Sequence, residues 1–333
     1  MPMSFELKKR EAIPEGIRRV VCKRIDKALE AVGGKRRGVS DRDVHEARKR
    51  FKEIRGALRL VRDELGEKHF RRENRTFRDA GRPLSAVRDA KVLVDSLDGL
   101  IAHFNGRVKP RSVSTLKRLL VDRRRETRDR VLGRDHAVSG IVRHVRAARK
   151  RVAGWPLEQR GWKAIEVGLQ TVYRQGRRAM RAARAARATA TRATRGDTSD
   201  EPMHEWRKRT KDLRYQLELL QGVWPEMLDP LVDQAHRLTD LLGEDHDLAV
   251  LRDVAREEAT NGSAVDAELL FALIGERRES LQKDAIELGQ KLYEERPRAF
   301  VARLHGYWKT ARGARGGGTR RAAVPAAAAP PGR

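Results

Sequence analysis

The chain has 333 residues and a formal net charge of +27 at pH 7, and arginine supplies most of its 74 basic residues. This balance predicts an acidic partner such as a nucleic acid, an anionic surface or a polyanion, and guanidinium groups favour phosphate because they donate paired hydrogen bonds. Cys22 is the single cysteine, which excludes an intrachain disulfide and a cysteine-based zinc cluster.

Hydrophobic residues recur with helical periodicity throughout, so we predict an all-α fold. The expected helices cover residues 14–32, 41–65, 68–98, 111–132, 135–152, 157–192, 200–222, 228–258, 264–294 and 297–311. Gly81 and Pro83 are expected to kink or break the third helix. Residues 313–333 are rich in Gly, Ala and Pro and are expected to form a disordered basic tail.

The expected location is the cytoplasm, with no part of the chain in a membrane. The first residues, MPMSFELKKREAIPEG, lack the apolar run of a signal peptide. No segment approaches the roughly 20 continuous apolar residues that a membrane-spanning helix needs.

Two helical segments repeat each other. VHEARKRFKEIRGALRLV (44–61) and MHEWRKRTKDLRYQLELL (203–220) are identical at nine of 18 positions without a gap. Ser40 and Ser199 precede them as equivalent candidate N-caps, and RDAKVL (88–93) aligns with HDLAVL (246–251) at nearly the same offset. The sequence therefore predicts a duplicated helical unit of about 150 residues, arranged as two helical bundles with approximate two-fold symmetry.

Each copy of the repeated helix has three faces at 100° per residue. The core face holds Val44, Ala47, Phe51, Ile54, Leu58 and Val61 in one copy and Met203, Trp206, Thr210, Leu213, Leu217 and Leu220 in the other. Beside it lies a basic stripe of His45, Arg48, Lys49, Lys52, Arg55 and Arg59, matched by His204, Arg207, Lys208, Lys211 and Arg214. Glu218 replaces the last arginine. The third face carries Glu46, Glu53, Glu205 and Asp212.

A solvated surface is the usual explanation of a charged stripe, but such a surface mixes both signs. This stripe is entirely positive in its first copy, and neighbouring cations repel each other by about 0.2–0.5 kcal/mol per pair. The acidic residues are expected on the far face in both copies. We therefore interpret the stripe as an anion site that is built twice.

Basic residues also precede each copy of the repeated helix. Arg19 and Lys23 lie in GIRRVVCKRIDKALEAV, and Arg174, Arg177, Arg178 and Arg181 lie in YRQGRRAMRAARAARATATR. Two interpretations of these residues remain open: they lie on a solvated helix face, or they contact the bound anion.

The doubled H-E-x-R-K-R-x-K-x-x-R helix, together with YRQGRRAMRAARAA, resembles the CHAD family, the conserved histidine alpha-helical domains. The resemblance covers residues 7–312, with halves of about 7–156 and 157–312. It implies two four-helix bundles with pseudo-two-fold symmetry around a basic central cavity or pore that binds inorganic polyphosphate, and an association with polyphosphate granules. The binding residues that it implies are His45, Arg48, Lys49, Lys52, Arg55, Arg59, His204, Arg207, Lys208, Lys211 and Arg214, with Arg19, Lys23, Arg174, Arg177, Arg178 and Arg181 as additions.

Three alternatives are weighed against a non-enzymatic polyphosphate binder without cofactors. A nucleic-acid-binding protein fits the charge equally well, although the stripe lacks interleaved aromatic residues for stacking on bases. A zinc peptidase does not fit, because Lys49 and Lys208 stand where H-E-x-x-H requires its second histidine. A polyphosphate phosphatase or kinase remains open through Glu244, Asp245, His246 and Asp247, for which salt bridges or helix capping are the expected role.

Overall fold

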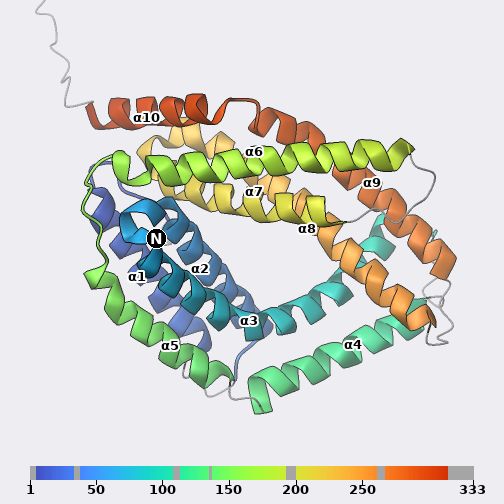
Figure 1. Ribbon diagram of the computed structural model, residues 1–333. Helices are drawn as coiled ribbons and strands as arrows, with labels where there is room; N and C mark the ends of the chain where they lie inside the picture. Colours follow the sequence, from blue (N-terminus) through green and yellow to red (C-terminus); the bar gives the residue numbers. More distant parts are fainter. Residues whose placement is uncertain are drawn as a thin grey trace, which may run out of the picture.

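The computed structural model describes residues 5–33, 38–107, 113–134, 137–192, 200–260 and 267–313, and within these residues the fold is all-α, as predicted (Figure 1). The helices are α1 (Ile13–Val32), α2 (Asp41–Leu60), α3 (Arg62–His103), α4 (Ser114–Arg128), α5 (Ala137–Arg151), α6 (Lys163–Arg192), α7 (Glu201–Leu220), α8 (Pro225–Thr260), α9 (Ala267–Leu292) and α10 (Pro297–Gly313). Ser199 and the tail beyond Gly313 lie outside the described residues.

The N-terminus of α2 is closed by the cap that the sequence predicts. The Ser40 side chain accepts a hydrogen bond from the backbone N–H of Asp43, and the Asp43 carboxylate accepts one from the backbone N–H of Ser40. This reciprocal capping box satisfies two N–H groups that the first helical turn leaves unpaired. The α7 helix begins instead after Asp200, whose side chain makes no capping hydrogen bond.

The helix does not break at Gly81 and Pro83, where the sequence predicts a kink or a break. Both residues lie inside α3, and the non-helical backbone within it is at Gly66, with φ 69° and ψ 155°. A positive φ of this size is readily adopted by glycine, which has no Cβ to clash with the backbone. The chain therefore turns sharply at Gly66, soon after α2 ends.

The two halves repeat one order of helix contacts. In the first half α1 packs on α2 and α2 on α3, while in the second α6 packs on α7 and α7 on α8. The halves meet where α2 packs directly against α7. The core faces predicted for both repeated helices are confirmed, because Phe51, Ile54, Trp206 and Leu213 are among their buried residues.

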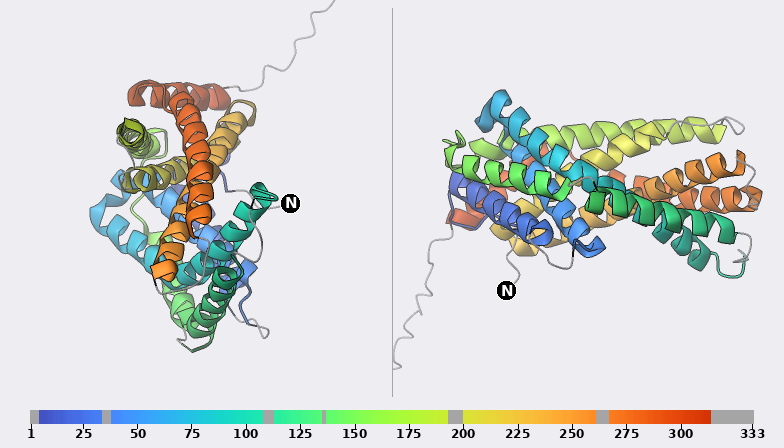
Figure 2. Two further views of the ribbon diagram at one scale, coloured as in Figure 1. Left: turned by 90° about the vertical axis from the view of Figure 1, so that its right-hand side faces the viewer. Right: turned by 90° about the horizontal axis from the view of Figure 1, so that it is seen from below.

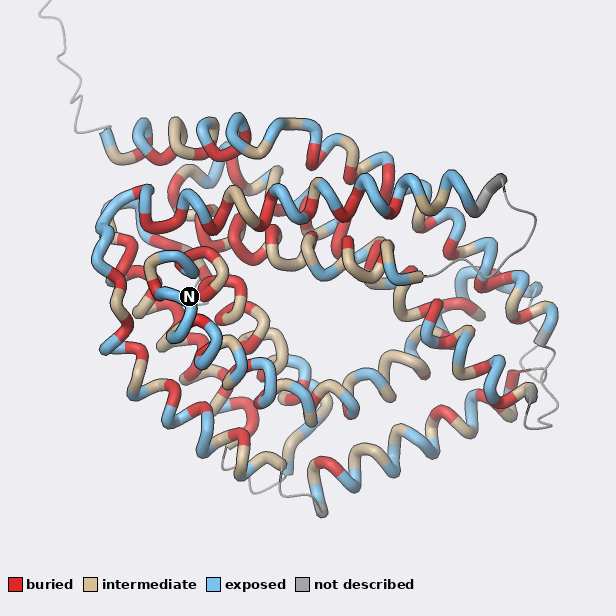
Figure 3. Tube along the Cα trace, in the orientation of Figure 1, coloured by how far each residue is buried: buried red, intermediate tan, exposed pale blue. Residues whose placement is uncertain are grey.

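The predicted grouping into two four-helix bundles is not confirmed, because the hydrophobic core is divided differently. One large cluster of buried residues combines helices of both halves, including α1, α2, α6 and α7. A smaller cluster joins the far ends of α3 and α8 to α4 and α9. These segments extend away from the main body (Figure 2), and buried positions gather where the helices face one another (Figure 3). No helix in the described residues is long and apolar enough to cross a membrane.

Candidate functional site

The basic stripes of α2 and α7 line two adjoining cavities, one of about 570 Å³ (the small cavity) and one of about 950 Å³ (the large cavity). Both cavities are lined by Arg48, Lys52, Asp89, Val92, Arg207, Lys211, Tyr215 and Asp247. The cations of this shared wall occupy equivalent positions of the repeat, Arg48 with Arg207 and Lys52 with Lys211. The repeat therefore places its central basic residues opposite each other.

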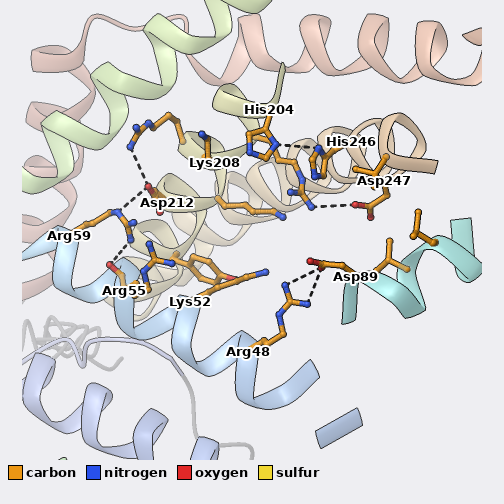
Figure 4. A pocket seen from close by; sticks show the side chains of 17 residues that line it. Arg48, Lys52, Arg55, Arg59, Asp89, His204, Lys208, Asp212, His246 and Asp247 are labelled. Carbon is orange, nitrogen blue, oxygen red and sulfur yellow. Dashed lines mark hydrogen bonds and ion pairs between the residues drawn. The ribbon is translucent and has the colours of Figure 1, made fainter. Parts of the chain in front are cut away.

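Each cavity combines opposite ends of the two stripes. The small cavity adds Arg55 and Arg59 from the second half of α2 to His204 and Lys208 from the start of α7 (Figure 4). The large cavity adds the remaining stripe residues, His45 and Lys49 from α2 and Arg214 from α7. All eleven stripe residues predicted from the sequence thus line at least one cavity.

Positive charge exceeds negative charge in both cavities. Eight arginines and lysines but three carboxylates line the small cavity, and eight but five line the large cavity. Buried or half-buried charges of one sign are unfavourable unless counter-charges compensate them. The lining therefore favours a bound anion.

The central arginines are partly compensated by aspartates from the helices that follow them. Arg48 lies 3.5 Å from the Asp89 carboxylate of α3 (Figure 4), and Arg207 lies 3.7 Å from the Asp247 carboxylate of α8. The two pairs are equivalent in the repeat. The sequence comparison aligned the two aspartates but gave them no place in the site. Their recurrence at equivalent positions of the repeat was the signal that could have identified them.

The central lysines are attracted by the same aspartates but form no ion pair with them. Among the described residues, neither the Lys52 nor the Lys211 amine has a hydrogen-bond or ion-pair partner. Burial and the neighbouring Arg48 and Arg207 lower the pKa of Lys52 to about 8. Burial, Arg207 and Lys52 also hold the pKa of Lys211 well below its ordinary value. Both shifts mean that the charged forms of the two lysine amines are unfavourable when no anion is bound beside them.

Histidines stand at the ends of the stripes. His204 Nδ1 lies 3.2 Å from Nδ1 of His246 on α8, a residue to which the sequence gave no binding role. Burial and the nearby Arg207 lower the pKa of His246 to about 4, and burial also lowers the pKa of His45 and His204. The imidazoles are therefore predominantly neutral at pH 7 in the empty site.

The expectation that all acidic residues lie away from the stripe is wrong for Asp212. Its carboxylate lines the small cavity and lies 3.2 Å from Nε of Arg59. Glu218, which replaces an arginine of the stripe, instead pairs with Arg214 and with His236 at 3.2 and 2.8 Å. Helical periodicity can show the Arg214–Glu218 pair, which lies within one helix, but not the contacts of Asp212 with Arg59 and of Glu218 with His236, which join two helices.

The additional residues from the preceding helices do not line either cavity. Arg19 is bound by the carboxylate of Glu11, and Arg177 donates to the backbone carbonyl of Tyr293. Arg174, Arg178 and Arg181 are exposed and Lys23 is half-buried, all outside the two cavities.

The acidic segment of α8 forms salt bridges, as expected. Glu244 pairs with Arg277 at 2.7 Å, and Asp245 pairs with Arg278 at 2.9 Å. These residues lie inside α8, so the alternative of helix capping is wrong. The described residues contain no group of three or more histidine, cysteine or acidic side chains arranged to hold a metal ion.

The family model of the CHAD domain matches residues 19–256, which include both copies of the repeated helix. The chain belongs to the CHAD family. A crystal structure of the CHAD domain from the plant Ricinus communis is similar, with a TM-score of 0.55, 17% sequence identity and coverage of 92% of this chain and 96% of that chain. At this identity the likeness establishes the CHAD fold alone. No curated protein matches the sequence.

Proposed function

We propose that this CHAD protein binds inorganic polyphosphate in the two adjoining cavities between α2 and α7. The observation that carries the proposal is the convergence of Lys52 and Lys211 in a shared wall where, among the described residues, neither amine has a hydrogen-bond or ion-pair partner. A flexible row of phosphates would supply the missing negative charge to both lysines at once. The resemblance to polyphosphate-binding family members supports the same ligand.

The spacing of the cations suits a chain of repeated anions. Basic residues one helical turn apart present donors at about 5 Å intervals, so a polyphosphate could contact successive turns of α2 and α7. Arginine adds paired hydrogen bonds to phosphate oxygens, whereas lysine acts as a point charge. Recognition would rest on charge and donor position, because the ligand has no bases to read.

Apolar side chains on the facing helices strengthen this electrostatic recognition. Val92 and Leu93 of α3 and Val250 of α8 line the small cavity opposite the basic stripes. Apolar walls lower the local dielectric constant, and a lower dielectric constant strengthens the attraction between cations and phosphate. The same surroundings make the charged forms of Lys52 and Lys211 unfavourable when no anion is bound.

We further propose that the protein binds polyphosphate without cleaving or extending it, in the cytoplasm and at polyphosphate granules. Asp89 and Asp247, the carboxylates of the shared wall, are engaged by arginines and poorly placed to act as general bases. Release of inorganic phosphate from polyphosphate in the presence of Mg²⁺ would contradict the non-enzymatic part of the proposal.

The binding site is tested by substituting Arg48, Lys52, Arg207 and Lys211 together by Ala. We expect long-chain polyphosphate binding to be lost in calorimetric titration while circular dichroism shows unchanged helicity. A matched control removes four exposed cations outside the cavities, Arg118, Arg143, Arg146 and Lys150. Retained affinity in the first variant, or equal loss in the control, would contradict the site.

A further inference from the structure

One face of α6 carries unneutralised positive charge. From Val167 to Arg192 the helix contains seven arginines and no carboxylate. Helical geometry places Arg174, Arg178 and Arg181 on one line, which we call the α6 ridge. All three are exposed, and within the described residues none is paired with a carboxylate.

Other arginines of α6 have structural roles that the ridge lacks. Arg177 donates to the Tyr293 carbonyl at 2.9 Å, and Arg187 lies 3.7 Å from the carboxylate of Glu279. These contacts join α6 to the end of α9 and to its middle. Binding to the rest of the fold therefore accounts for part of the arginine content of α6 but not for the ridge.

The corresponding helix of the first half has no equivalent ridge. In α1, Arg19 is bound by Glu11 and Arg24 by Glu53, and the helix itself contains Glu15, Asp26 and Glu30. The α1 helix therefore has no counterpart of the ridge.

The ridge is linked to the small cavity through one residue of α7. Arg209 of α7 lines this cavity and donates a hydrogen bond of 3.2 Å to the side chain of Gln175 on α6. Gln175 directly follows Arg174 and precedes Arg178 by one turn. The α6 and α7 helices run side by side (Figure 1), so the ridge lies one helix away from the cavity that has the larger excess of positive charge.

We propose that the α6 ridge is a second polyphosphate contact, which holds the part of a long chain that leaves the small cavity. This inference rests on the proposed function and adds chain-length selectivity to it. The ridge spans about 10 Å from Arg174 to Arg181. A chain short enough to lie within the cavities would not reach it, whereas a long chain would gain three further charged contacts.

The test compares two probes, tripolyphosphate and long-chain polyphosphate, on wild type and on the triple variant Arg174→Gln, Arg178→Gln, Arg181→Gln. The control is Arg143→Gln, Arg146→Gln, Lys150→Gln, which removes the same charge from exposed positions of α5, a helix without carboxylates. We expect the ridge variant to bind tripolyphosphate like wild type and to lose on the order of tenfold in affinity for the long chain. Each lost phosphate contact should reduce the slope of log K against log salt by about 0.7, so the loss of three contacts should reduce the slope by about 2.

Three results would contradict the proposed role of the ridge. These are unchanged long-chain affinity in the ridge variant, equal losses of long-chain affinity in the ridge and control variants, or a loss of tripolyphosphate affinity in the ridge variant as large as its loss for the long chain. Each would leave the cavities as the polyphosphate site. Wild type that binds neither probe would instead overturn the proposed function, so the two failures are distinguishable.

Discussion

Gly56 and Tyr215 occupy equivalent positions of the two repeats, and they lie against each other where α2 crosses α7. A Cβ placed on Gly56 would lie 2.6 Å from Cβ of Tyr215. In a two-fold arrangement a residue meets its own counterpart only at the axis, so the approximate axis passes through this contact. The crossing explains why each cavity joins the first half of one stripe to the second half of the other.

The close approach at this crossing requires a glycine. We expect Gly56→Ala to lower the free energy of unfolding by about 1–3 kcal/mol, because the added methyl group overlaps the rigid Cβ of Tyr215. The control is Gly275→Ala in α9, where no neighbouring atom lies within 4 Å and alanine should stabilise the helix by about 0.5–1 kcal/mol. Urea denaturation measures both, and equal effects would contradict the crossing.

The uncompensated lysines predict opposite effects on stability and binding. Lys52→Met keeps much of the aliphatic side chain but removes one of several like charges. We expect the free energy of unfolding at pH 7 to rise by about 1 kcal/mol, after allowance for solvent screening, while polyphosphate affinity falls. Lys150→Met, on the exposed side of α5, should change neither quantity appreciably. A less stable Lys52→Met protein would show that repulsion among the cavity cations does not destabilise the fold.

The lowered pKa of Lys52 predicts a pH dependence. Lys52 faces Arg48 on its own helix, Arg207 and Arg214 on α7 and Asp89 on α3. Its amine is protonated below about pH 8 in the empty site, and bound phosphate favours the protonated form, so binding raises the pKa. Affinity should therefore fall as pH rises through 8 towards the ordinary lysine value, with proton uptake on binding.

Titrations at pH 8.5 in two buffers of different ionisation enthalpy measure this proton uptake. Lys52→Arg remains charged throughout the range and should take up fewer protons and show a flatter pH profile than wild type. Identical profiles for wild type and Lys52→Arg would exclude Lys52 as the titrating group.

Sequence reasoning succeeded where the information lies within one helix. The alternation of core and basic faces in α2 and the N-cap at Ser40 follow from local spacing, and the equivalence of Lys52 and Lys211 follows from the repeat. It failed where two helices determine the outcome, as for Asp212 beside Arg59 and for Asp89 beside Arg48. Those contacts depend on how helices are rotated and offset against each other, which no single periodicity encodes.

Asp212 competes with a bound anion for Arg59. We expect Asp212→Asn to raise polyphosphate affinity several-fold, because the small cavity loses one of three carboxylates. Stability should fall by about 3 kcal/mol, since Arg59 loses its ion-pair partner and is left as a largely buried, unpaired charge. Asp79→Asn breaks an exposed ion pair with Arg78 and should change stability by less than about 1 kcal/mol. Reduced affinity in Asp212→Asn would argue against competition.

Nucleic acid is the rival ligand for the same positive charge. Tyr215 is the one phenylalanine, tyrosine or tryptophan that lines the described cavities, and its ring is 4.5 Å from the guanidinium of Arg214 and largely buried. It is therefore not available to stack on a base, which is how proteins commonly hold single strands.

Calorimetric titration of the purified protein with long-chain polyphosphate and, separately, with a DNA duplex decides whether the cavities are selective for polyphosphate. The two ligands are matched for phosphate concentration and compared at physiological salt, because both affinities depend on salt. We predict saturable polyphosphate binding with DNA weaker by at least about tenfold, or about 1.4 kcal/mol. Equal affinities would show that the stripes supply only a diffuse positive field and would contradict a site built for polyphosphate.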